Sequence, residues 1–161
     1  MFGFGKKKKE QEKAPEKAEL LELKNIRLNC PRMEKDDVIR EVGKMFVEGG
    51  YTEEGYTEGM LKRELTFATN IGNGIAIPHG VEEAKKLVKK SGIVVMVFPE
   101  GTSWGNEDVK LVIGIAGAGE EHLEVLSIVA EKMMEESAVD RLVKGTKEEI
   151  YRTFTEKGDA E

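Results

Sequence analysis

Two nearly continuous apolar runs in the middle of the chain constrain its fold more than any other feature. IVVMVF occupies positions 93–98, and VKLVIGI occupies positions 109–115. Such runs are typical of central strands with both faces buried under helices, whereas a strand with one solvated face alternates apolar and polar residues. Segments with helical spacing precede and follow these runs, so strands and helices alternate along most of the chain. The sequence therefore predicts the α/β class.

The length of 161 residues suits one ordinary domain, which can bury a core without disulfides or a structural metal. Apolar residues recur at helical spacing between 38 and 46, and Gly49 and Gly50 then provide a stop. Thr146 and Glu149 form a capping-box pattern for a last helix that ends near Thr155. Further helices are expected over about 53–64, over about 120–134 and from about Ser137.

Shorter patterns predict the remaining segments. NIRLN at 25–29 alternates apolar and polar residues, which indicates a short strand before Pro31. Residues 66–80, TFATNIGNGIAIPHG, are predicted as loop, short strand at 75–77, and loop. Residues 99–108, PEGTSWGNED, are rich in turn formers and are predicted as a loop between the two central strands.

The first 20 residues are predicted to be a flexible tail, disordered or weakly helical. They are mostly charged, and Phe2 and Phe4 are their only large apolar side chains ahead of Leu20, so burial cannot offset the entropy of ordering them. The domain is accordingly expected over 21–157. Because the two phenylalanines stand beside four lysines, weak contact of the tail with an anionic membrane surface is a hypothesis.

Composition and charge restrict the functional classes. The formal charge is −6, and a chain with more acids than bases is a poor ligand for a nucleic-acid backbone. The single cysteine, Cys30, cannot form an internal disulfide. The sequence has neither a secretory signal nor an apolar run of about 20 residues. We therefore expect a cytoplasmic protein that does not bind nucleic acid.

His79 is the first candidate for chemistry, because imidazole is the side chain that can be a neutral nucleophile near neutral pH. It ends the strand-like segment GIAIPHG, where Pro78 restricts the backbone and Gly74 and Gly80 allow close approach of a ligand. Loops that leave strand ends are favoured places for sites in α/β sheets. The alternative is a structural, hydrogen-bonded histidine in a turn.

His122 and Arg63 are two further candidates. His122 falls in the first turn of the helix opened by GAGEEHLEVL, where backbone amides favour an anion. Arg63 ends the second expected helix, just before the glycine-rich segment, and its guanidinium could reach a phosphoryl group. Each could instead be simply solvated. No zinc-ligand spacing, P-loop or Gly-x-Ser-x-Gly elbow is present, so neither a metal nor a nucleotide cofactor is expected.

Two longer motifs resemble one known family. NIGNGIAIPHG is similar to the phosphorylation site of the enzyme IIA domains of the bacterial sugar phosphotransferase system, in the mannitol and fructose group. FPEGTSWGNED followed by LVIGIAGAGEEHLEVLSIVA resembles the second half of the mannitol-type members. The resemblance extends over about residues 21–154 and has both signatures in the family order.

The resemblance implies both a fold and a function. It implies a mixed sheet flanked by helices, with His79 as the phosphorylated nucleophile and with His122 and Arg63 holding the phosphoryl oxygens. The donor would be the phosphocarrier HPr, and the acceptor would be a cysteine of the enzyme IIB domain of a mannitol permease. Some relatives carry glutamate at the position of Asn73, so Asn73 and Gly74 are candidates for lining the site.

Three functional readings follow. The first is the mannitol phosphocarrier, which the PEGTSWGN segment favours. The second is a fructose-type or a regulatory, nitrogen-type enzyme IIA with a similar histidine loop. The third is an interaction module without phosphotransfer. Transfer of phosphate to a mannitol IIB domain distinguishes the first reading from the others.

Overall fold

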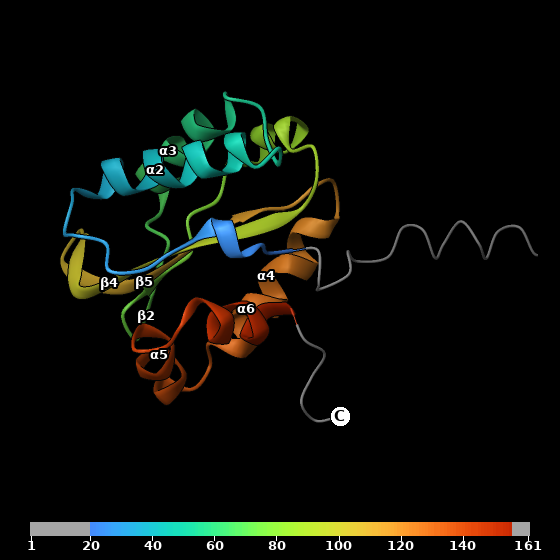
Figure 1. Cartoon of the computed structure of the whole chain (residues 1–161). Helices are drawn as coiled ribbons and strands as arrows, with labels where there is room; N and C mark the ends of the chain where they lie inside the picture. The colour runs from blue at the N-terminus through green and yellow to red at the C-terminus, as the bar shows by residue number, and fades with distance from the viewer. Residues whose placement is uncertain (1–19, 156–161) are drawn as a thin grey trace, which may run out of the picture.

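A five-stranded mixed sheet forms the centre of the protein (Figure 1). The computed structural model describes residues 20–155, so the expected tail and its suggested membrane contact lie outside the described residues, apart from the buried Leu20. The strand order is β1-β4-β5-β3-β2. The strands are β1 (Ile26–Arg27), β2 (Asn70–Gly72), β3 (Ile75–Ala76), β4 (Gly92–Trp104) and β5 (Glu107–Ala116).

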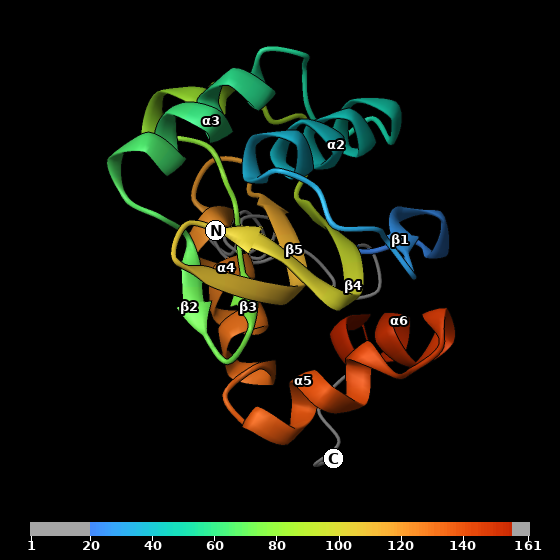
Figure 2. The same cartoon turned by 90° about the vertical axis from the view of Figure 1, so that its left-hand side faces the viewer.

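Helices cover both faces of this sheet, which confirms the predicted class and layering (Figure 2). On one face lie α2 (Lys35–Glu48) and α3 (Tyr56–Thr66), and on the other lie α4 (Glu121–Lys132), α5 (Glu136–Val143) and α6 (Lys147–Thr155). Short 3₁₀ helices, η2 (Leu23–Asn25) and η3 (Glu82–Leu87), lie in the connections. No helix among residues 20–155 is both long and apolar enough to cross a membrane.

The two central strands divide the core into two apolar clusters. Ile93, Val95 and Val97 of β4 pack in the cluster under α4, α5 and α6. The alternate residues Val94 and Met96 pack in the cluster under α2 and α3. Both sets are buried, which explains why the run is apolar at every position.

The predicted loop at 99–108 is wrong. Most of this segment extends β4 and β5 into a long antiparallel hairpin whose last pair is Trp104 and Glu107. Gly105 has a positive φ of 69° at the first position of the two-residue turn, as hairpin turns often require. The register shifts between Val97 and Thr102, so the hairpin contains an irregularity rather than an even apolar alternation.

Other boundaries also differ from the sequence prediction. The strand expected at 25–29 is only the two residues of β1, and β2 was not expected at all. The helix expected from 53 begins at Tyr56 in α3. The capping box of α6 is confirmed, because Thr146 N donates to Glu149 and Glu149 N donates to Thr146 Oγ1, at 2.8 and 3.1 Å.

Strand direction brings two connections to one end of the sheet. β3 is parallel to β5, so their carboxyl ends lie at the same edge. The residues that follow β3 include His79, and those that follow β5 lead into α4 and His122. This edge is therefore where the two histidines meet.

Candidate functional site

The turn that carries His79 is fixed to the end of β5. Ile115 N donates to the carbonyl oxygen of Pro78 at 2.9 Å. The Nδ1 atom of the half-buried His79 ring lies 2.8 Å from the carbonyl oxygen of Ile77. Because a carbonyl oxygen only accepts, this bond places the proton of the neutral ring on Nδ1. The lone pair of Nε2 is then free to act as a nucleophile.

His122 lies directly beside this ring. The two imidazole centroids are 5.2 Å apart, and the ring planes are inclined by 50°. His122 is the second residue of α4, and the helix can begin this close to β5 because residue 117 is glycine. A Cβ atom at Gly117 would lie 2.7 Å from His122 N and 2.8 Å from His122 Cβ.

Both imidazoles are held in their neutral form. Burial lowers the pKa of His79, the hydrogen bond to Ile77 partly offsets this, and the positive charge of Arg63 lowers it further. Burial also lowers the pKa of His122, to about 4, and the neighbouring His79 and Lys85 lower it in the same direction. A neutral His79 is the nucleophilic form, and a neutral His122 can still donate one N–H.

Arg63 acts on the same pair from the last turn of α3. Its guanidinium donates to the carbonyl oxygen of Phe67 at 2.9 Å and lies 5.6 Å from the centroid of the Phe67 ring. Its charge lowers the pKa of both His79 and His122, so the structure brings the three predicted residues into one electrostatic environment.

Sequence reasoning missed the contribution of η3, the 3₁₀ helix just after His79. Lys85 lowers the pKa of both imidazoles, whereas Glu82 raises that of His122. Lys85 Nζ and Glu82 Oε1 also form an ion pair at 3.4 Å. The only sequence signal was their closeness to the PHG segment, which does not indicate where these side chains lie.

A buried carboxylate supports the strand that leads to His79, and it was also missed. Glu64 accepts hydrogen bonds from Thr69 N and Thr69 Oγ1, both at 2.8 Å, and from Trp104 Nε1 at 2.9 Å. The carbonyl oxygen of Thr69 in turn accepts from Ile77 N at 3.0 Å. Glu64 therefore connects α3 to the residues that hold the His79 ring.

The structure separates Asn73 and Gly74 from His79. Both have positive φ angles, 55° and 76°, and form the turn of the β2–β3 hairpin. Lys110 N donates to Gly74 O, whereas Ile115 N donates to Pro78 O. Leu111 N also donates to Gly74 O, so the nearest anchor points, Leu111 and Ile115, are four positions apart on β5, about 13 Å at the rise of a strand. The two residues lie at the opposite end of β3 from the imidazole pair.

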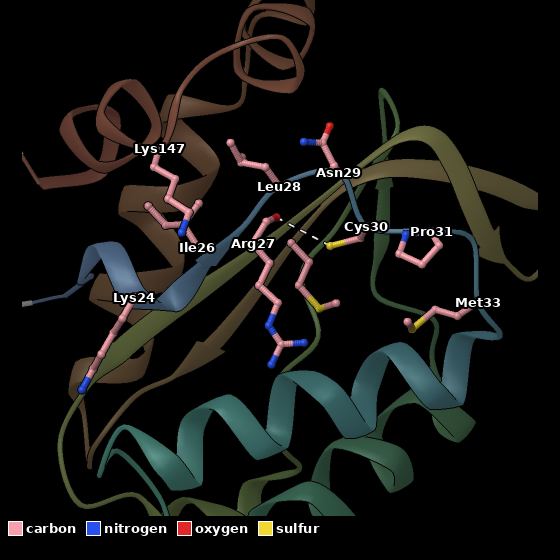
Figure 3. Close-up of a pocket in the computed structure, with 10 residues that line it drawn as sticks. Lys24, Ile26, Arg27, Leu28, Asn29, Cys30, Pro31, Met33 and Lys147 are labelled. Atoms are coloured by element: carbon pink, nitrogen blue, oxygen red, sulfur yellow. Dashed lines mark hydrogen bonds between the residues drawn. The ribbon is translucent and has the colours of Figure 1, made fainter.

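A groove of about 450 Å³ lies at the β1 edge of the sheet, and strands β4 and β5 lie between β1 and β3 (Figure 3). Lys24, Arg27 and Lys147 line it together with apolar side chains. Arg27 is ion-paired with Glu41 at 2.8 Å, and Lys24 lies 3.5 Å from a carboxylate oxygen of Glu22. Neither imidazole lines this groove.

The imidazole pair can accept a phosphoryl group. It provides a free Nε2 on His79, and the second imidazole and the cations Arg63 and Lys85 provide positive potential for phosphoryl oxygens. Comparison with known proteins agrees with this chemistry. Residues 19–157 match the family described as "Phosphoenolpyruvate-dependent sugar phosphotransferase system, EIIA 2".

The matches to individual relatives extend over almost the whole length of those proteins. The mannitol-specific phosphotransferase enzyme IIA component of Staphylococcus aureus (strain Mu50) is 41% identical over 143 residues, which are 89% of this chain and 99% of that protein. The crystal structure of IIA mannitol from Escherichia coli has a TM-score of 0.77 at 37% identity, over 83% of this chain and 98% of that one. An NMR structure from Escherichia coli is a complex of enzyme IIAMTL with phosphorylated enzyme IIBMTL. It has a TM-score of 0.79 at 35% identity, over 85% of this chain and 98% of that one. The chain therefore belongs to the EIIA 2 family of the phosphoenolpyruvate-dependent sugar phosphotransferase system.

Proposed function

We propose that this chain is a cytoplasmic phosphocarrier for mannitol uptake. It takes a phosphoryl group from phospho-HPr onto His79 and passes it to a cysteine of the enzyme IIB domain of a mannitol permease. The family and the mannitol-specific relatives support the class of reaction. The observation that carries the choice of atom is the bond from His79 Nδ1 to Ile77 O, which leaves Nε2 unprotonated.

In the accepting step, the Nε2 lone pair of His79 attacks phosphorus in line with the bond to the donor imidazole. The new N–P bond forms as the N–P bond in phospho-HPr breaks, and the electron pair returns to the donor ring. No proton has to move, because Nδ1 of His79 keeps its proton. His122, Arg63 and Lys85 lower the energy of the negative charge on the transferring oxygens.

In the donating step, a cysteine thiolate of IIB attacks the same phosphorus. An S–P bond forms, the N–P bond breaks, and neutral His79 is regenerated. The site must therefore bind the phosphoryl group only moderately. Each 1.4 kcal/mol of extra stabilisation of phospho-His79 would slow this step about tenfold if the transition state gained none of it.

Exposed apolar side chains beside the site provide a docking face for both partners. Leu123 follows His122 and is 69% exposed, and Phe67, which contacts Arg63, is 67% exposed. Leu65, near the end of α3, is 88% exposed. Large apolar groups that remain exposed around a polar centre are typical of interaction surfaces. A shared face fits a carrier that meets its donor and its acceptor in turn.

The test is phosphorylation of the full chain by phosphoenolpyruvate, enzyme I and HPr, followed by addition of mannitol and fructose IIB domains. We expect acid-labile phosphate on His79 and transfer to the mannitol domain. Transfer only to the fructose domain would establish the fructose-type alternative. Phosphorylation without transfer to either domain would favour the regulatory alternative. Absence of phosphorylation would favour an interaction module without phosphotransfer.

Two histidine variants form a matched pair for this assay. His79→Ala should accept no phosphate, because the nucleophile is gone. His122→Ala should still accept phosphate on His79 but about tenfold more slowly or worse, because it lacks one group that stabilises the oxygens. If the two variants exchanged these results, His122 would be the acceptor and the proposed roles would be wrong.

A further inference from the structure

Two buried hydroxyl groups lie just behind the imidazole pair, and the phosphotransfer steps do not use them. The first is that of Tyr56, at the start of α3. It accepts a hydrogen bond from Gly80 N at 2.9 Å and donates one to Ile115 O at 2.9 Å. Burial raises the pKa of Tyr56 to about 12, so the phenol keeps its proton. Since Ile115 N binds Pro78 O, Ile115 holds both sides of the His79 turn.

The second hydroxyl belongs to Ser91, which lies just before β4. It accepts from Ala118 N at 2.9 Å and donates to the carboxylate of Glu121. Glu121 is the residue before His122 and the first residue of α4. Ser91 therefore ties the connection from β5 and the first turn of α4 to the adjacent strand.

We propose that Tyr56 and Ser91 are positioning residues, which hold the His79 turn and the start of α4 against the end of β5 and so set the separation of the two imidazoles. The inference rests on the proposed role of His79 as phosphoryl acceptor. Neither hydroxyl has a hydrogen bond to an imidazole among the described residues. Each acts only through the backbone or the neighbouring residue of one histidine.

The energetic reason is that phosphoryl transfer depends on position. A misplacement of about 1 Å can slow a reaction about a hundredfold, because the reacting atoms leave their near-attack arrangement. The His79 turn follows the two-residue strand β3, and His122 lies in the first turn of a helix. Ends of short elements have few backbone bonds of their own. The hydrogen bonds of the Tyr56 and Ser91 hydroxyls fix the position of these two segments, which have few backbone hydrogen bonds within helices or strands.

The test compares Tyr56→Phe with Tyr51→Phe. Tyr51 is equally buried and packs against the same Phe46 ring, 5.9 Å away compared with 6.0 Å for Tyr56. Its hydroxyl accepts from Asn25 Nδ2 at 3.4 Å and has no bond to the His79 turn. Removing it controls for the loss of a buried hydroxyl as such.

The test likewise compares Ser91→Ala with Thr102→Val. The Thr102 hydroxyl is buried and also bridges two groups, because it donates to Met33 O at 2.7 Å and accepts from Met33 N at 2.9 Å. It lies on the β4–β5 hairpin, beyond the register shift and away from α4. Its removal controls for the loss of a bridging hydroxyl.

We expect Tyr56→Phe and Ser91→Ala to lower kcat for phosphorylation by phospho-HPr about tenfold, with KM unchanged, because the exposed docking face is intact. The ¹⁵N spectrum of the unphosphorylated protein should change mainly at His79 in Tyr56→Phe and mainly at His122 in Ser91→Ala. The two control variants should retain the wild-type kcat and both imidazole signals.

Equal loss of kcat in the control variants, or unchanged imidazole signals in the two test variants, would overturn the positioning role. Failure of the proposed function looks different, since the wild-type chain itself would then accept no phosphate. The spectra of the unphosphorylated protein test the positioning in either case.

Discussion

Gly117→Ala adds a methyl group where α4 begins, and its effect on the imidazole pair can be worked out from the structure. The new Cβ would meet backbone atoms of His122, including N at 2.7 Å. Backbone atoms cannot rotate away, so the start of α4 has to move by about 1 Å to reach ordinary contact at about 3.4 Å. Overpacking of this kind costs about 1–3 kcal/mol of stability. A displacement of about 1 Å can slow transfer about a hundredfold.

The assay is the single-turnover rate of phosphorylation of Gly117→Ala by phospho-HPr, measured at a temperature where circular dichroism shows the variant folded. Gly114→Ala is the control, because its Cβ would clash with Val42 Cγ1 and lie 3.1 Å from Val94 Cγ2, on the side of α2. It should lose stability but transfer phosphate at nearly the wild-type rate. A Gly117→Ala variant with wild-type transfer, or equal losses in both variants, would refute the inference that the start of α4 sets the site.

Three further predictions concern pH and two carboxylates. Because folding lowers the pKa of His79 and His122, the unfolded chain binds more protons between pH 6.5 and about 4, so the free energy of unfolding should fall as pH drops through this window. Urea titrations should show a shallower fall in His122→Gln, and an identical slope would contradict the shift. Glu64→Gln should lower the free energy of unfolding by about 1–3 kcal/mol and slow phosphorylation, because the carboxylate accepts three buried hydrogen bonds. Glu58 is exposed on the same helix, so Glu58→Gln should change neither the free energy of unfolding nor the rate of phosphorylation. Glu149→Ala breaks the capping box of α6, so the free energy of unfolding measured by urea denaturation should fall by about 1 kcal/mol. The rate of phosphorylation should not change.

The sequence pattern was sufficient to predict those features that depend only on neighbouring residues. The two apolar runs became the central strands because their apolar side chains are buried on one face or the other. The capping box at Thr146 formed as expected, since it needs only residues three positions apart. The predicted loop at 99–108 failed because its turn formers occupy the irregular part and the tip of a hairpin, and its pairing partner was not visible as an alternating pattern.

The α/β class, the central strands and the segment that bears His79 can be predicted from the sequence alone, because the spacing of apolar residues, the helix caps and the glycine–proline turn are properties of neighbouring residues. Other relations appear only in the folded chain: the ring centroids of His79 and His122 lie 5.2 Å apart, Asn73 lies in the turn of the β2–β3 hairpin, and the Tyr56 and Ser91 hydroxyls bond to the segments around the two histidines. These relations depend on the parallel pairing of β3 with β5 and on where α3 and α4 begin. Pairings between segments tens of residues apart are set by the packing of the whole core, which no short window of sequence contains.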